Sequence, residues 1–161
     1  MSIHPLAVVS PDATVAEDVE IGPFSVVEPG VTIGPGCQLA SRVTIRTGTQ
    51  LASKNRVMEG AVLGGLPQHV NVPDAPGRLI IGNGNVLREN VTIHRSLDAD
   101  GVTKLSDDCL IMVGAHVAHD CYLADGAILT NNVMLGGHVD VGSRAYLAGA
   151  VAVHQFCRIG S

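Results

Sequence analysis

From Leu105 to Ile159 the chain reads LSDDCL IMVGAH VAHDCY LADGAI LTNNVM LGGHVD VGSRAY LAGAVA VHQFCR I, and every group of six opens on Leu, Ile or Val. The same phase runs from Ile3 to Leu63 and returns between Ile81 and Ile93, so 24 of its 27 positions are Ile, Leu or Val. The three exceptions are His69, Ala75 and Ala99. A period of six fits neither an α-helix nor a simple strand alternation. It is typical of a hexapeptide-repeat solenoid and predicts an all-β, single-stranded parallel β-helix.

The composition fits a single β-helix domain over residues 1–161. Hydrophobic residues make up 46% of the chain but aromatic residues only 2%, so small and aliphatic side chains must fill a narrow interior. The net charge is −5 and the 10 Lys and Arg residues form no cluster, which argues against a nucleic acid or an anionic membrane surface as partner. The apolar runs are too short to span a bilayer, and the first residues lack the features of a signal peptide. We therefore expect a cytoplasmic protein that is not inserted in a membrane.

A second interior column lies two residues before each aliphatic position and holds mostly Ala and Val. All four cysteines, Cys37, Cys109, Cys121 and Cys157, fall in this column. A free Cys behaves there as a small hydrophobic residue, so we expect buried and inert thiols, with no disulfides. Metal-bound thiolates or a catalytic Cys remain the alternatives.

Three hexads should form one triangular coil of 18 residues, so the 24 regular hexads predict about eight coils. The segments 64–79 and 97–104 are rich in Pro, Gly and Asp, which predicts two loops that project from corners of the prism. Such loops often carry function, although tolerated surface insertions would look the same. The sequence stops at Ile159-Gly160-Ser161 without a polar cap. We therefore expect a truncated product, or one whose open end is covered.

Residues 18 apart lie above one another on successive coils, and this rule builds two polar columns. They are His119, Gly137 and Gln155, and beside them Asp120, His138 and Phe156. Neither column belongs to the interior phases, so we expect both to face outward or to lie at a corner. A histidine beside a carboxylate, with a glycine N–H one coil above, offers a general base and an oxyanion donor, which is the minimum for acyl transfer to a hydroxyl.

Two other interpretations of these histidines remain open. They could be solvated or lie at a subunit interface without chemistry. They could also bind zinc between subunits, as in the β-helical γ-class carbonic anhydrases. The paired histidines of that class lie five residues apart, whereas here the fifth residue after His116, His119 and His138 is Cys121, Ala124 and Ser143. We therefore expect no metal.

The stretch Gly114–Cys121, GAHVAHDC, resembles the active-site segment of the UDP-N-acetylglucosamine acyltransferases that begin lipid A synthesis. Further matches at that family's spacings are Val91–Arg95, Asn131–Asn132, Gly136–Val139 and Val153–Cys157. The resemblance implies a left-handed β-helix, which is an exception to the right-handed crossover rule. It also implies a homotrimer with its active sites in the clefts between prisms.

The implied reaction moves a 3-hydroxyacyl chain from acyl carrier protein to the 3-hydroxyl of UDP-N-acetylglucosamine, by direct attack and without a cofactor. By resemblance, His119 is the general base, Asp120 holds His119, and the Gly137 N–H stabilises the oxyanion. The residues that would contact the sugar nucleotide or line the site are His116, His138, His154 and Gln155.

Two departures from the family pattern matter. Where the family usually carries Gln-Asp-Leu-Lys, this chain has Gln68-His69-Val70-Asn71, so His69 and Asn71 replace an acidic and a basic substrate contact. The further coils and the helical domain with which the family continues are absent from these 161 residues. A related transferase acting on another sugar nucleotide, and a non-catalytic trimeric scaffold or fragment, therefore stand as alternatives.

Overall fold

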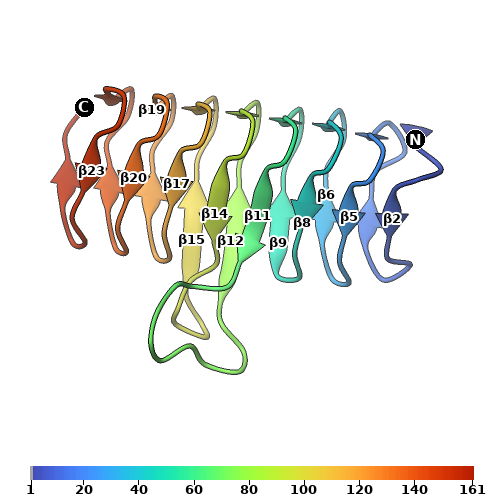
Figure 1. Ribbon diagram of the computed structural model, residues 1–161, viewed down its shortest axis with the longest axis horizontal. Helices are drawn as coiled ribbons and strands as arrows, with labels where there is room; N and C mark the ends of the chain where they lie inside the picture. The colour runs from blue at the N-terminus through green and yellow to red at the C-terminus, as the bar shows by residue number, and fades with distance from the viewer. Residues whose placement is uncertain (1) are drawn as a thin grey trace.

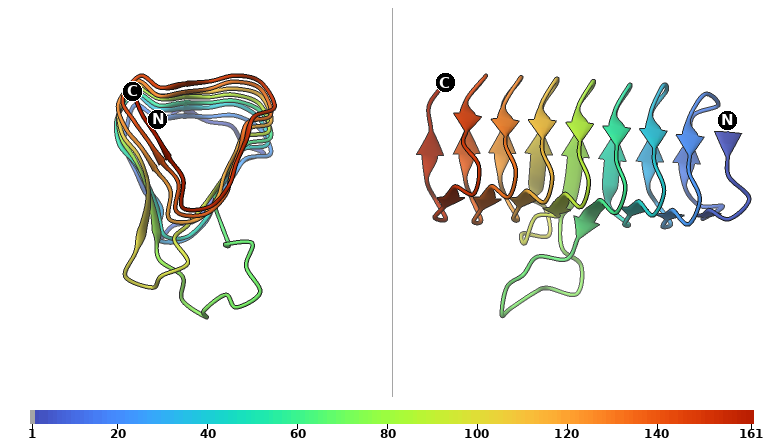
Figure 2. Two further views of the ribbon diagram at one scale, coloured as in Figure 1. Left: turned by 90° about the vertical axis from the view of Figure 1, so that its left-hand side faces the viewer. Right: turned by 45° about the horizontal axis from the view of Figure 1, so that its top comes forward.

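Each six-residue repeat folds as one short strand and one turn, and the strands stack into a three-sided prism (Figure 1). The computed structural model describes residues 2–161, which contain 24 strands and no helix. Seen from its end, the prism has a triangular cross-section with two loops projecting from one corner (Figure 2). None of the described residues lies in a helix that could cross a membrane.

Each face of the prism is one parallel sheet of eight strands. The first sheet consists of β1 (Ser2–Ile3), β4 (Glu20–Ile21), β7 (Gln38–Leu39), β10 (Arg56–Val57), β13 (Val86–Leu87), β16 (Leu110–Ile111), β19 (Ile128–Leu129) and β22 (Tyr146–Leu147). The second consists of β2 (Val8–Val9), β5 (Val26–Val27), β8 (Thr44–Ile45), β11 (Val62–Gly65), β14 (Thr92–His94), β17 (His116–Val117), β20 (Met134–Leu135) and β23 (Ala152–Val153). The third consists of β3 (Thr14–Val15), β6 (Thr32–Ile33), β9 (Thr49–Leu51), β12 (Arg78–Ile81), β15 (Val102–Leu105), β18 (Tyr122–Leu123), β21 (Asp140–Val141) and β24 (Arg158–Ile159).

The register confirms the coil of 18 residues and the parallel β-helix. In the first sheet Leu110 pairs with Ile128, and Ile111 pairs with Leu129. The chain winds as a left-handed parallel β-helix, so every connection departs from the usual right-handed crossover. The repeat allows this because each strand is followed by a tight turn rather than by a helix that must pack back on the sheet.

The interior consists of the two predicted columns. The aliphatic positions from Ile21 to Leu147 are buried, and Cys37, Cys109 and Cys121 are buried in the small-residue column. Burial raises the pKa of the Cys109 and Cys121 thiols to about 11, which agrees with the expected low reactivity; that low reactivity stays a prediction. Cys157 lies beside the last strand and is only partly buried, so the prediction of a buried thiol is wrong there.

Both projecting loops connect the second sheet to the third. The first spans residues 66–77 between β11 and β12, and the second spans residues 95–101 between β14 and β15. The predicted limits, 64–79 and 97–104, are therefore wrong at their ends. Strands β12 and β15 pair over four residues, from Arg78 with Val102 to Ile81 with Leu105. Because the loops leave from the same corner, their flanking residues extend the ladder beyond the hexapeptide repeat.

Candidate active site

One edge of the prism, where the second sheet turns into the third, collects most of the predicted chemistry. We call it the loop edge; both loops leave from it, and the turns 118–121, 136–139 and 154–157 follow on the next three coils. In these turns Asp120, His138 and Phe156 have φ values of 60°, 59° and 64°. The same left-handed backbone recurs at turns elsewhere in the prism, as at Arg42 and Lys54 with φ values of 58° and 60°, so it is a feature of the repeat. It turns the chain sharply enough that two neighbouring side chains can meet.

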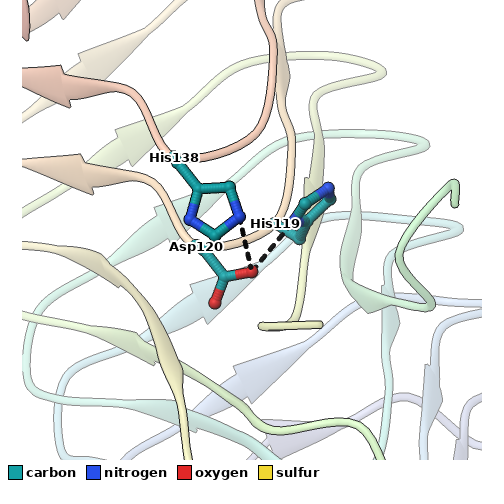
Figure 3. Close-up of side chains that lie close together, drawn as sticks. All are labelled: His119, Asp120 and His138. Atoms are coloured by element: carbon teal, nitrogen blue, oxygen red, sulfur yellow. Dashed lines mark hydrogen bonds and ion pairs between the residues drawn. The ribbon is translucent and has the colours of Figure 1, made fainter. Parts of the chain in front are cut away.

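His119 and Asp120 form a hydrogen-bonded pair at this edge (Figure 3). The His119 Nδ1 atom lies 2.8 Å from Asp120 Oδ2, and both side chains are nearly excluded from solvent, at 10% and 12% exposure. An ionised carboxylate only accepts hydrogen bonds, so Nδ1 carries the proton and donates it. Nε2 of the neutral imidazole is then left unprotonated and free to accept a proton.

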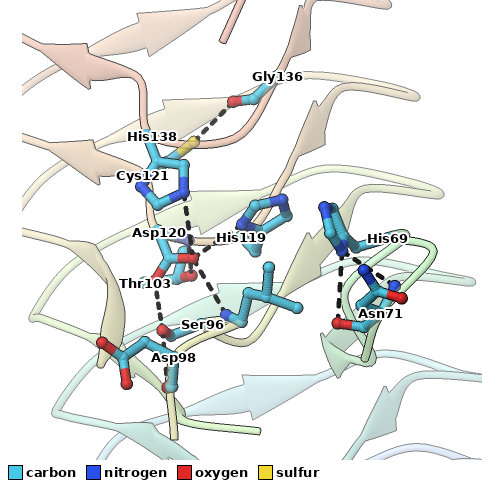
Figure 4. A network of polar contacts seen from close by, with 11 residues as sticks. His69, Asn71, Ser96, Asp98, Thr103, His119, Asp120, Cys121, Gly136 and His138 are labelled. Carbon is cyan, nitrogen blue, oxygen red and sulfur yellow. Dashed lines mark hydrogen bonds and ion pairs between the residues drawn. The ribbon is translucent and has the colours of Figure 1, made fainter. Parts of the chain in front are cut away.

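The Asp120 carboxylate is held from several sides, chiefly by the second loop (Figure 4). Ser96 Oγ contacts Oδ1, and the Leu97 N–H donates to Oδ2 at 3.1 Å. The backbone of Asp120 is held as well, because its N–H donates to Thr103 Oγ1 at 2.7 Å. Burial raises the pKa of Asp120, but the hydrogen bonds from Ser96, His119 and Leu97 outweigh it, so the pKa lies below its ordinary value. Asp120 is therefore ionised at neutral pH.

Ser96, Leu97 and Thr103 carry no motif, and sequence reasoning missed them. The signal that could have found Ser96 is its spacing of 24 residues from Asp120, one coil of 18 plus the six residues by which the second loop lengthens its coil. The stacking of the coils thus places Ser96 beside Asp120, although no sequence motif contains Ser96.

Gly137 lies directly against the His119 ring on the next coil. A Cβ atom at this position would lie 2.5 Å from His119 Cε1 and 2.7 Å from Nε2. The Gly137 N–H donates to no group among residues 2–161, which leaves it free for a ligand. The predicted stacking of these two residues is confirmed. His119 lies at a corner, as expected, but it is only 8% exposed because the next coil covers its ring.

A pocket of about 590 Å³ opens beside this pair. Its predicted lining residues are His69, His116, His119, Gly137, His154 and Gln155. Its other walls are largely apolar and include Ala118, Met134 and Val153. The pocket therefore combines a few polar groups with an apolar surface, as ligand sites usually do.

The other three predicted residues lie outside the pocket lining. Asp120 lies behind His119, and His138 stacks on Phe156 with ring centroids 4.6 Å apart. The Asn71 N–H donates to His69 Nδ1 at 3.1 Å, so Asn71 orients His69, whose ring centroid lies 6.0 Å from that of His119. Asn71 thus acts on the pocket through His69.

A second buried histidine supports the pocket wall, and sequence reasoning assigned it no role. His94 packs edge-on against His116 at a centroid distance of 4.7 Å, and Thr92 Oγ1 lies 2.8 Å from His116 Nδ1. Burial, with smaller contributions from His116 and His119, lowers the pKa of His94 to about 4. Burial also lowers the pKa of His116, so both rings are neutral at neutral pH.

His119, Asp120 and His138 are also the residues that could hold a metal ion, since one ligand atom from each lies within 4.8 Å of the others. His138 Nε2 lies 3.8 Å from Asp120 Oδ2. The expectation of a metal-free site stays a prediction.

Comparisons with known proteins agree with this geometry. Residues 12–47 match the bacterial transferase hexapeptide (six repeats) family. The chain is 53% identical to an acyl-[acyl-carrier-protein]–UDP-N-acetylglucosamine O-acyltransferase of Thiobacillus denitrificans and 47% identical to one of Halorhodospira halophila, over 99% and 98% of its length. The solved UDP-N-acetylglucosamine O-acyltransferase of Moraxella catarrhalis superposes with a TM-score of 0.96 at 36% identity, over 99% of this chain and 63% of the other. The chain spans 62% of the length of both curated relatives. It belongs to the hexapeptide-repeat UDP-N-acetylglucosamine O-acyltransferase family.

Proposed function

We propose that the chain carries the catalytic edge of an acyltransferase that moves a 3-hydroxyacyl group from acyl carrier protein to the 3-hydroxyl of UDP-N-acetylglucosamine, the first step of lipid A biosynthesis. The observation that carries the proposal is the 2.8 Å pair of His119 and Asp120 beneath the free Gly137 N–H. The names of the relatives supply the donor and the acceptor.

His119 acts as the general base. Nε2 takes the proton of the sugar hydroxyl as the hydroxyl oxygen attacks the thioester carbonyl carbon. The ionised Asp120 fixes the tautomer that leaves Nε2 free and stabilises the imidazolium that forms.

The tetrahedral intermediate places a negative charge on the former carbonyl oxygen. The Gly137 N–H donates to that oxygen, and preorganised donors of this kind lower acyl-transfer barriers strongly. When the carbon–sulfur bond breaks, His119 returns its proton to the departing carrier thiolate, which yields the sugar ester and the free carrier thiol. No acyl-enzyme is needed, which agrees with the burial of Cys121 and its thiol pKa of about 11.

The pocket suits an acceptor rich in hydroxyls. His116, His154 and Gln155 offer polar contacts, while Ala118, Met134 and Val153 can pack against an alkyl chain. The proposal includes a homotrimer in which a neighbouring prism closes the pocket, and a cytoplasmic site of action where the two soluble substrates meet. The remaining length of the relatives leaves room for further contacts to the nucleotide and the carrier protein.

The test is an acyl-transfer assay with 3-hydroxyacyl carrier protein and UDP-N-acetylglucosamine, run on the longest form of the protein. His119→Ala should lower kcat/KM by at least about 100-fold, the usual contribution of a general base. His4→Ala, an exposed histidine at the far end of the prism, is the matched control and should keep full activity. A loss much below 100-fold for His119→Ala would contradict the base role.

His69 gives a specific reason to test other acceptors, because it lines the pocket near His119. Comparing kcat/KM over a panel of UDP-sugars shows whether the acceptor is UDP-N-acetylglucosamine or a UDP-sugar with a free amino group. Turnover of another sugar would favour a related transferase. Absence of both binding and turnover would favour a scaffold.

A further inference from the structure

We propose that the second loop, residues 95–101, is a positioning device for the His119–Asp120 pair, and that Ser96 is the positioning residue that acts through Asp120. The kinetic part of this inference rests on the proposed function. The structural part, that Ser96 decides how Asp120 meets His119, does not depend on the substrate.

Ser96 is fully buried, and its hydroxyl has two oxygen neighbours, Asp120 Oδ1 and the Asp98 carbonyl at 3.0 Å. A hydroxyl has one proton to give, and an ionised carboxylate is the stronger acceptor. The Asp98 carbonyl already receives the Gly101 N–H at 2.9 Å. The Ser96 proton is therefore directed to Asp120.

This contact completes the fixation of the carboxylate. Oδ1 is bound by Ser96, while Oδ2 receives the Leu97 N–H at 3.1 Å and His119 Nδ1 at 2.8 Å. The loop thus supplies one donor to each oxygen, so rotation of the carboxylate about its bond would break both contacts.

The packing of the loop leaves little room for Ser96 or Asp120 to move. A Cβ atom on Gly101 would collide with Ser96 Oγ and would lie 3.2 Å from Asp120 Oδ1. The loop backbone therefore closes tightly over Ser96 and Asp120. Such an approach is available only to glycine at this position.

The fixation matters because Asp120 has a second histidine within reach. His138 Nε2 lies 3.8 Å from Oδ2, and its side chain is 41% exposed. Without the Ser96 contact, the carboxylate can turn toward His138 and loosen its bond to His119. We infer that Ser96 keeps Asp120 paired with His119 and thereby keeps the His119 proton on Nδ1.

The experiment combines nitrogen NMR of the histidine rings with steady-state kinetics. Ser96→Ala should reduce the share of the Nδ1–H tautomer of His119 and lower kcat about 10-fold with little change in KM, well short of the ~10⁴-fold cost of disabling the orienting carboxylate of a triad. Ser96→Cys keeps the shape of the loop but replaces the hydroxyl with a weak donor, so it should shift both readouts in the same direction. Ser106→Ala is the matched control, since it removes another buried serine hydroxyl, one that contacts Tyr122 instead.

A double-mutant cycle with Asp120→Asn tests whether Ser96 acts through Asp120. Ser96→Ala should cost little further activity in the Asp120→Asn background, because the two changes remove the same function. Additive losses would overturn the proposal. An unchanged His119 tautomer in Ser96→Ala, with a kcat equal to that of Ser106→Ala, would overturn it as well. If the protein proves to use another substrate, the NMR result still decides the role of Ser96.

Discussion

Adding one methyl group at Gly137 should displace His119, the proposed general base, while leaving the proposed oxyanion donor, the residue-137 N–H, in place. The new Cβ would lie 2.5 Å from His119 Cε1 and 2.7 Å from Nε2, whereas carbon contacts settle near 3.5 to 4.0 Å. The backbone does not oppose alanine, because the φ of Gly137 lies outside the positive range. His119 must therefore retreat by about 1 Å, the difference between these distances.

The ring cannot retreat without cost, because His119 Nδ1 is tied to Asp120 at 2.8 Å. A misplacement of about 1 Å typically costs about 100-fold in rate, which is about 2.7 kcal/mol of barrier. Strain from overpacking should also lower the free energy of unfolding by about 1 to 3 kcal/mol. The residue-137 N–H remains in the variant, so the rate loss reports the position of His119.

The assay is acyl transfer under saturating substrates, with urea unfolding run in parallel. Gly149→Ala is the matched control, since its Cβ would meet only ordinary contacts at 3.6 and 3.8 Å. We expect its activity to match that of the unaltered protein. If Gly137→Ala stays within about threefold of Gly149→Ala, His119 does not need the space that Gly137 provides, and the reasoning is refuted.

Three further predictions concern stability and reactivity. Burial lowers the pKa of His94 to about 4, below the ~6.5 of an unfolded histidine. The contribution of His94 to the free energy of unfolding should therefore stay constant above pH 6.5. It should fall by roughly 3 kcal/mol as the pH drops to 4, because the unfolded state then binds the proton more readily. Urea unfolding across this range should be measurably less pH-dependent in His94→Gln, and an equal dependence would disprove the assignment. Asn85→Ala removes the side-chain oxygen that accepts the buried Cys109 N–H at 2.8 Å. It should lower the free energy of unfolding, measured with urea, by about 1 to 3 kcal/mol. The control Asn131→Ala, at an exposed position, should lower it by less than about 0.5 kcal/mol. In a thiol-reagent titration of the native protein, Cys157 should react first and the buried thiols only on unfolding; rapid reaction of all four would contradict the burial.

The aliphatic ladder was enough to predict the fold, because a narrow prism needs the same two interior positions in every hexad. A single break in phase would turn a whole run of side chains outward, so the 24 regular positions constrain one another. The limits of the loops were not predictable in this way. Strands β12 and β15 lengthen by pairing with each other, and that contact joins residues 24 apart.

The candidate site was likewise predictable only in part. Stacking at intervals of 18 residues predicted that His119 and Gly137 meet, and the turn at Asp120 explains how neighbours in sequence can pair. The sequence contained no sign that His119 is covered, or that Ser96 holds Asp120.

By itself, the sequence determined the β-helix, the buried cysteines other than Cys157, and the stacking of His119 and Gly137 in one column. Each of these follows from a period, and a period constrains structure through neighbours at a fixed spacing. Only the tertiary structure decided which groups hold Asp120 and how deeply His119 lies. Those properties depend on where a loop without periodicity folds back, and the packing of Gly101 and Ser96 against Asp120 sets that position.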